Sequence, residues 1–146
     1  MTGAVFVDTN VLVYARDASE PEKQQKATAW MTHLWASRRG RLSVQVLQEF
    51  YVTVTQKLSP GMTREAARRD VRNLMAWRPL TIDTALLERA WTAQDRHRLA
   101  FWDGLIVAAG QVAGCRYLLS EDFQPDRQLD DLTVVNPFLR DVASLT

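Results

Sequence analysis

Short uninterrupted runs of apolar residues alternate along the chain with longer segments in which apolar positions recur every three or four residues. The short runs are rich in branched and aromatic residues, which is typical of buried strands. Because helical segments separate these runs, we expect an α/β fold with a parallel sheet of about five strands, flanked by helices on both faces. The predicted strands cover residues 4–7, 42–44, 79–82, 116–119 and 132–135.

The longer segments predict six helices. Pro21 suits the first turn of the second helix, Thr63 can cap the fourth, and Asp83 or Thr84 can cap the fifth. The sixth helix is apolar on almost every side, so we expect it to be buried. The predicted helices cover residues 9–16, about 20–40, 45–57, 64–77, about 84–98 and 102–113.

The composition indicates one globular domain over residues 1–146. Apolar residues make up 47% of the chain, which is enough to form a core, and no segment has the composition of a linker. The net charge of +1 excludes a strongly basic protein that coats nucleic acid, although a local basic surface remains compatible with it. The single cysteine, Cys115, excludes an intrachain disulfide and a cysteine-based zinc site.

The sequence also bears on location. No apolar run is long enough to span a membrane, and the N-terminal residues lack the basic start and the cleavage pattern of a signal peptide. We therefore expect a cytoplasmic protein without a membrane segment.

Four carboxylates occupy positions that are unusual for a solvated charge. Asp8 and Asp122 each directly follow a predicted strand, at the edge where parallel sheets bind their ligands. Asp103 lies in the first turn of the most apolar helix, and Glu49 has apolar neighbours in the middle of another helix. Clustered carboxylates repel one another unless a cation neutralises them, and oxygen ligands without cysteine or histidine suit Mg²⁺ or Mn²⁺ better than Zn²⁺.

Each of these acids also has a purely structural explanation. Asp8 could cap the helix that follows it, and Asp103 could complement a helix dipole. Glu49 could extend into solvent from the edge of its helix, and Asp122 could be a turn residue. A shared site replaces four separate explanations with one. Small polar residues beside the acids could hydrogen-bond the carboxylates or act as caps themselves: Thr9, Asn10 and Ser120.

Basic residues are concentrated in one part of the chain. Between Arg38 and Arg72 there are eight cations and three acids, which gives this segment a net charge of +5. Such a segment could bind a polyanion such as RNA, or it could form a solvated helix face. The residues that we assign to RNA binding are Arg38, Arg39, Arg41 and Arg68.

Four segments resemble the motifs of a known family. Residues 6–14, FVDTNVLVY, are similar to the opening of PIN domains, the nuclease fold of VapC-type toxins. Residues 43–51, SVQVLQEFY, resemble the second motif with its single helical Glu. Residues 101–109, FWDGLIVAA, resemble the third, in which an Asp opens an apolar helix. Residues 118–123, LLSEDF, are similar to the fourth, a strand followed by Thr or Ser, any residue, and then Asp or Asn.

The resemblance covers nearly the whole chain and implies a PIN-like domain with endoribonuclease activity that depends on Mg²⁺ or Mn²⁺. It also implies a homodimer and a cognate antitoxin that neutralises the activity. Attack by water at such a metal centre is expected to leave RNA products with a 5′-phosphate and a 3′-hydroxyl. The implied catalytic and metal-binding residues are Asp8, Glu49, Asp103 and Asp122, with Asp8 and Asp103 as the most direct ligands.

Two features depart from the family pattern or leave a choice open. Gly104 stands where many relatives have Ala. Glu121 is a second acid beside Asp122, and the spacing of the motif favours Asp122 as the residue that faces the site.

Three other functions are compatible with acids at strand ends. A phosphatase or phosphotransferase with an Asp nucleophile typically has a second Asp two residues later, where this chain has Asn10. A phospho-receiver module uses a lysine near a late strand, whereas the lysines here are Lys23, Lys26 and Lys57. A catalytically silent binding module would keep the acids for folding alone.

Overall fold

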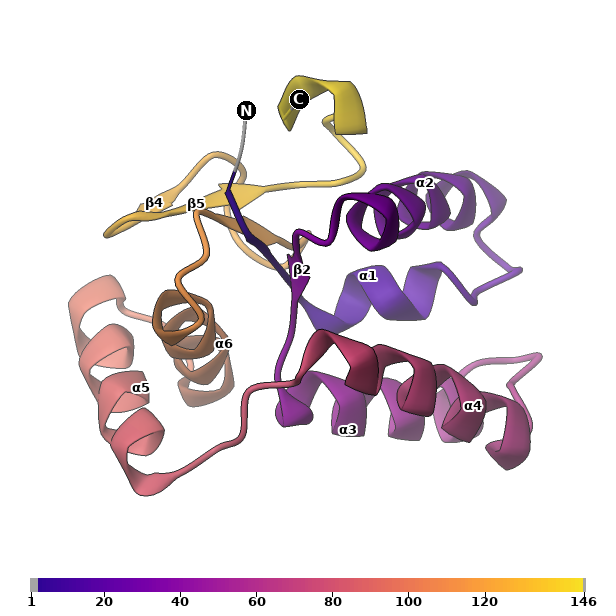
Figure 1. The fold of residues 1–146 in the computed structure, drawn as a ribbon, viewed down its shortest axis with the longest axis horizontal. Coiled ribbons are helices and arrows are strands. Elements are labelled where there is room, and N and C mark those ends of the chain that lie inside the picture. The colour runs from indigo at the N-terminus through magenta and orange to yellow at the C-terminus, as the bar shows by residue number, and fades with distance from the viewer. Residues whose placement is uncertain (1–2, 146) are drawn as a thin grey trace.

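A five-stranded sheet in the order β2-β1-β3-β5-β4 forms the centre of the protein, which a computed structural model describes for residues 3–145 (Figure 1). Strand β1, Val5–Val7, pairs in parallel with β2, Gly40–Arg41, and with β3, Tyr117–Leu119. Strand β3 pairs in parallel with β5, Leu132–Val135. Strand β4, Gln128–Leu129, pairs antiparallel with β5. The predicted α/β class is therefore confirmed.

The sequence prediction is wrong for one strand and misses another. In place of a strand over 79–82, Leu80 forms a single parallel bridge to Ser43. Pro79 has no N–H to donate, and Asp83 already caps the next helix, so a longer strand has no room here. The missed strand, β4, has only two residues, and one of them is exposed, so it leaves no apolar run in the sequence.

The other predicted strands agree more closely with the structure. The strands predicted over 4–7, 116–119 and 132–135 are confirmed to within one residue. The strand predicted over 42–44 lies two residues too late, because Gly40 and Arg41 make the pairs with β1. The segment after β2 forms the bridge to Leu80 instead.

All six predicted helices are present, with ends that differ by a few residues. Pro21 opens the second helix as predicted. Thr63 caps the fourth by accepting the Ala66 N–H at 3.1 Å, and Asp83 caps the fifth by accepting the Leu86 N–H at 2.8 Å. The helices are α1 Thr9–Tyr14, α2 Pro21–Ser37, α3 Val44–Val52, α4 Arg64–Leu74, α5 Thr84–His97 and α6 Phe101–Val112.

Helices cover both faces of the sheet, with α5 and α6 on one side and α1 and α2 on the other (Figure 1). Every residue of β1 and β3 is accordingly buried, and so is Cys115. A π-helical segment, Thr53–Lys57, continues α3, and two 3₁₀ segments, Met75–Trp77 and Val142–Leu145, follow α4 and β5. Within residues 3–145, none of the helices has the length and apolar character needed to cross a membrane.

Gly104 allows α5 and α6 to pack closely. A Cβ atom at this position would lie 2.8 Å from the Ala90 carbonyl oxygen, which is too close for a methyl group beside a backbone atom. We expect Gly104→Ala to destabilise the protein by about 1–3 kcal/mol, although alanine ordinarily stabilises a helix relative to glycine by about 1 kcal/mol. Urea unfolding measures the change, and an unchanged or higher midpoint would contradict the tight packing.

Candidate active site

Two parallel strands end side by side and bring polar residues to one edge of the sheet. Asp8 follows β1, Ser120 follows β3, and the Asp8 N–H donates to the Leu119 carbonyl at 3.0 Å. Because both strands run in the same direction, the side chains that follow them meet. Ser120 Oγ donates to Asp8 Oδ2 at 2.7 Å, and both residues are buried. The strand ends therefore form one buried polar centre.

The Asp8 carboxylate is fixed by hydrogen bonds to both of its oxygens. Oδ1 accepts the Thr9 backbone N–H at 2.7 Å, and Oδ2 accepts Asn10 Nδ2 at 3.3 Å in addition to the Ser120 hydroxyl. Asp8 is also the N-cap residue of α1, because its Oδ1 accepts the Thr9 N–H. Helix capping therefore explains the position of one carboxylate oxygen. The other oxygen faces the polar centre, and only 5% of the residue is exposed.

Asn10 connects Asp8 to a second acid, Asp122. Its Nδ2 donates to Asp122 Oδ2 at 3.1 Å and to Ser120 Oγ at 3.1 Å. The Asp122 N–H also donates to Ser120 Oγ at 3.1 Å, which fixes the loop after β3. Of the two roles that the sequence leaves open for Asn10 and Ser120, both residues make hydrogen bonds to carboxylates.

Glu49 and Asp103 approach the same centre from two helices. Thr9 Oγ1 donates to Glu49 Oε1 at 2.9 Å, which brings α3 against the start of α1. Asp103 lies in the first turn of α6. Partial burial, together with the negative charge of Asp122, raises the pKa of the Asp103 carboxyl. Acids from four distant segments of the chain therefore lie within reach of one another's charge.

The acids are not neutralised by basic side chains. Burial raises the pKa of Asp8 to about 7, although the hydrogen bonds from Ser120 and Thr9 favour its ionised form. The charges of Asp122 and Glu49 raise this pKa further. Among residues 3–145, the ion pairs with lysine, arginine or histidine involve other acids. A cation bound from solution would therefore neutralise the negative charge of these acids.

The donor set fits a hard divalent cation. The available atoms are carboxylate oxygens supported by hydroxyl and amide groups, which Mg²⁺ and Mn²⁺ prefer. In the described part of the chain, no three acidic, histidine or cysteine side chains are already arranged closely enough to hold an ion. Glu49 and Asp122 are exposed, so their side chains have room to change conformation when an ion binds.

Glu121 is turned away from the acidic cluster. Lys23 Nζ lies 2.9 Å from Glu121 Oε2 and also lies over the rings of Tyr14 and Phe138, which contact each other. The Glu121 N–H donates to Asn10 Oδ1 at 3.3 Å. Asp122, not Glu121, is the acid that Asn10 connects to Asp8, in agreement with the motif spacing. No local pattern in the sequence indicates this contact of Lys23, because its partner is 98 positions away.

The four arginines assigned to RNA binding lie in three different environments. Arg38 and Arg41 line a pocket beside β2. Arg39 is directed toward the N-terminal strand, where its Nε donates to the Gly3 carbonyl at 2.8 Å. Arg68 lies over a tyrosine ring between α3 and α4. RNA binding by these residues stays a prediction.

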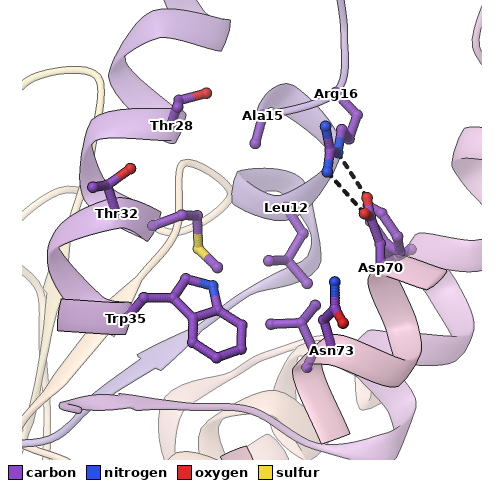
Figure 2. A pocket seen from close by; sticks show the side chains of 11 residues that line it. Leu12, Ala15, Arg16, Thr28, Thr32, Trp35, Asp70 and Asn73 are labelled. Atoms are coloured by element: carbon purple, nitrogen blue, oxygen red, sulfur yellow. Dashed lines mark hydrogen bonds and ion pairs between the residues drawn. The ribbon is translucent and has the colours of Figure 1, made fainter. Parts of the chain in front are cut away.

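A separate pocket of about 280 Å³ lies between α1, α2 and α4 (Figure 2). Arg16 and Asp70 face each other at its edge and are joined by hydrogen bonds of 2.7 and 2.8 Å. Leu12 and Trp35 contribute apolar surface to the same pocket (Figure 2). Its one acid is already neutralised by arginine, so this pocket is distinct from the acidic cluster.

The buried Asp8 carboxyl makes the stability of the metal-free protein depend on pH. Its pKa is about 7 in the folded protein and 3.8 ordinarily, so the folded state keeps a proton that the unfolded chain has released. Stability is therefore expected to fall as the pH rises from about 4 to about 7, by on the order of 3 kcal/mol. Asp8→Asn should remove this loss. Urea unfolding of both proteins in a chelator, across this pH range, measures the difference, and parallel curves would contradict it.

The fold and the acids at its strand ends define an α/β protein with an acidic site at the carboxyl edge of a parallel sheet. The model of the PIN domain family matches residues 5–128, which is most of the chain. The chain belongs to the PIN domain family.

Two solved structures have a similar fold. The sarcin-ricin-loop-cleaving toxin VapC20 of Mycobacterium tuberculosis is 23% identical, with 82% of this chain and 92% of that chain covered and a TM-score of 0.62. A toxin–antitoxin complex from Klebsiella pneumoniae is 19% identical, with 95% of this chain and 99% of that chain covered and a TM-score of 0.58. None of the curated proteins matches this sequence.

Proposed function

We propose that this PIN domain is a metal-dependent endoribonuclease and the toxin of a toxin–antitoxin pair. The proposal rests on Asp8, Glu49, Asp103 and Asp122, which influence one another's charge near one edge of the sheet and, among residues 3–145, form no ion pair with a basic side chain. The similarity to a toxin that cleaves the sarcin-ricin loop supports RNA as the substrate class.

The four acids would together hold Mg²⁺ or Mn²⁺. Such an ion, when bound, activates water for attack on phosphorus and stabilises the leaving oxygen. Asp8 is held in place by Thr9 and Ser120, so its carboxylate keeps one orientation while the substrate enters and leaves. Glu49 and Asp122 are exposed, so either carboxylate can accept the proton that the attacking water loses.

The proposal also covers the partner, the oligomeric state, the location and the reaction products of the nuclease. An antitoxin protein neutralises the nuclease, as the similarity to a toxin–antitoxin complex supports. The nuclease acts as a homodimer, and it acts in the cytoplasm on RNA. Its products carry a 5′-phosphate and a 3′-hydroxyl.

The contacts at the site count against the other functions considered. Asn10 donates to two carboxylates through its amide, so it supports the acids and does not replace the second Asp of a phosphotransferase. Lys23 is paired with Glu121 and packed on aromatic rings, which differs from the free lysine that a phospho-receiver needs.

The test is incubation of the purified protein with RNA in Mg²⁺, in Mn²⁺ and in a chelator. Cleavage is expected with either ion and not with the chelator. Cleavage that continues unchanged in the chelator would exclude the metal-dependent mechanism, and intact RNA under all three conditions would exclude the nuclease.

A further inference from the structure

A pocket of about 670 Å³ lies beside the edge strand β2, away from the four acids. It is formed by the ends of α2 and of the 3₁₀ segment after α4, and by the C-terminal end of α6 at Ala113. Asp103 lies in the first turn of α6, so about 15 Å of helix separates the acidic cluster from this pocket. The pocket is therefore a second surface on the same molecule.

Three arginines line this pocket, and none of its described lining residues is acidic. Arg38 and Arg78 are exposed, and within residues 3–145 neither forms an ion pair. Arg41 donates to the carbonyls of Arg38 and Gly40 at 3.0 and 2.9 Å, so its guanidinium is fixed against the backbone. A net charge of +3 is thus concentrated here in a chain whose total charge is +1.

Two tryptophans form an aromatic wall in the same pocket. The rings of Trp35 and Trp77 lie 5.1 Å apart with an interplanar angle of 56°. The Trp77 ring also lies directly on Gly40, where a Cβ would come within 2.3 Å of it. Trp35 is 40% exposed. Indole surface therefore stays accessible next to unpaired guanidinium groups.

The two exposed arginines of the pocket share a backbone conformation that Arg98, at the end of α5, also adopts. Arg38 and Arg78 both have positive φ values, 58° and 54°, at the ends of helical segments. Glycine is the residue that fits this conformation with least strain. Arginine occupies both positions, and both side chains line the same pocket.

We propose that this pocket binds one or two nucleotides of single-stranded RNA and so anchors the substrate at a distance from the acids. The inference rests on the proposed ribonuclease function. Guanidinium groups bind phosphate through two parallel hydrogen bonds, and exposed indoles stack on bases. A second copy of the chain in a two-fold contact would bring arginines against arginines. An acidic peptide would use the charges but leave the indoles without a role.

The test compares two charge-matched double variants in RNA binding. Arg38→Gly/Arg78→Gly removes two guanidinium groups and relieves the backbone, so the variant should fold at least as stably as the wild type. Arg64→Ala/Arg69→Ala removes the same charge from exposed positions of α4 that line none of the pockets described. Fluorescence anisotropy of a labelled single-stranded RNA, in a chelator that prevents cleavage, measures the affinity of each protein.

We expect the glycine variant to bind the RNA about tenfold more weakly than the wild type. The slope of the logarithm of the binding constant against the logarithm of the salt concentration should become shallower by about 1.4. Both changes should be much smaller in the control variant. In cleavage assays its KM should rise while kcat stays near the wild-type value. Equal losses in both variants, or an unchanged affinity and KM, would overturn the inference.

Two further measurements identify the occupant. Polyglutamate should compete poorly with RNA at equal charge concentration, and sedimentation should give the same molecular mass for the glycine variant as for the wild type. Effective competition, or a change in mass, would mean that the pocket binds protein and would also overturn the inference. If the wild type cleaves no RNA, the proposed function fails, while the anisotropy comparison still tests the pocket.

Discussion

Asp8→Asn is expected to lower the rate of RNA cleavage by about a thousandfold or more. Asparagine has nearly the same shape and can still accept the Thr9 N–H, so the fold should persist. It cannot provide the negative charge that a divalent cation needs at the centre of the cluster. Single-turnover cleavage of a defined RNA by the two proteins, at saturating Mg²⁺, measures the effect.

The matched control is Asp95→Asn, because Asp95 is an exposed acid on α5. It should cleave RNA at the wild-type rate. Circular dichroism and unfolding midpoints establish that both variants are folded, and the Asp8 variant should be the more stable one near neutral pH. Wild-type cleavage by a folded Asp8→Asn protein would leave the acids with a role in folding alone.

Removing the charge of Asp122 should lower the rate of RNA cleavage, whereas removing the charge of its neighbour Glu121 should leave the rate nearly unchanged. Asp122→Asn is expected to reduce cleavage by about a hundredfold or more, because Asn10 connects this carboxylate to Asp8. Glu121→Gln is expected to change the rate by less than about threefold, since Glu121 is paired with Lys23 and faces away. Cleavage rates and the Mg²⁺ concentration for half-maximal rate measure both effects.

The two substitutions control for each other, since both remove one negative charge from adjacent positions. A simple effect of net charge on RNA binding would change both proteins alike. If Glu121→Gln were the damaging change and Asp122→Asn the tolerated one, the assignment of the fourth acid would be reversed.

The sequence could predict the features that depend on neighbours along the chain. The helix caps at Thr63 and Asp83 and the apolar strands follow from local patterns, and the structure confirms them. That Asp8 and Asp122 would meet was predictable too, because both follow strands of one parallel sheet.

Features that depend on distant partners could not be predicted. Lys23 has no local signal that it pairs with Glu121, and the bridge of Leu80 to Ser43 depends on how two loops meet. The arginines between 38 and 72 look alike in the sequence, yet Arg39 is held by a backbone carbonyl while Arg38 lines a pocket. Charge counts along a chain do not separate these cases, because they ignore which face of the fold each side chain reaches.

Determining the chemical ends of RNA cut by the purified wild-type protein tests the central claim most directly. With Mg²⁺ present, the account predicts internal cuts that leave 5′-phosphate and 3′-hydroxyl ends, and no cuts in a chelator. Fragments with 2′,3′-cyclic phosphate ends that form equally well in the chelator would contradict it, because the carboxylate cluster would then have no part in the reaction.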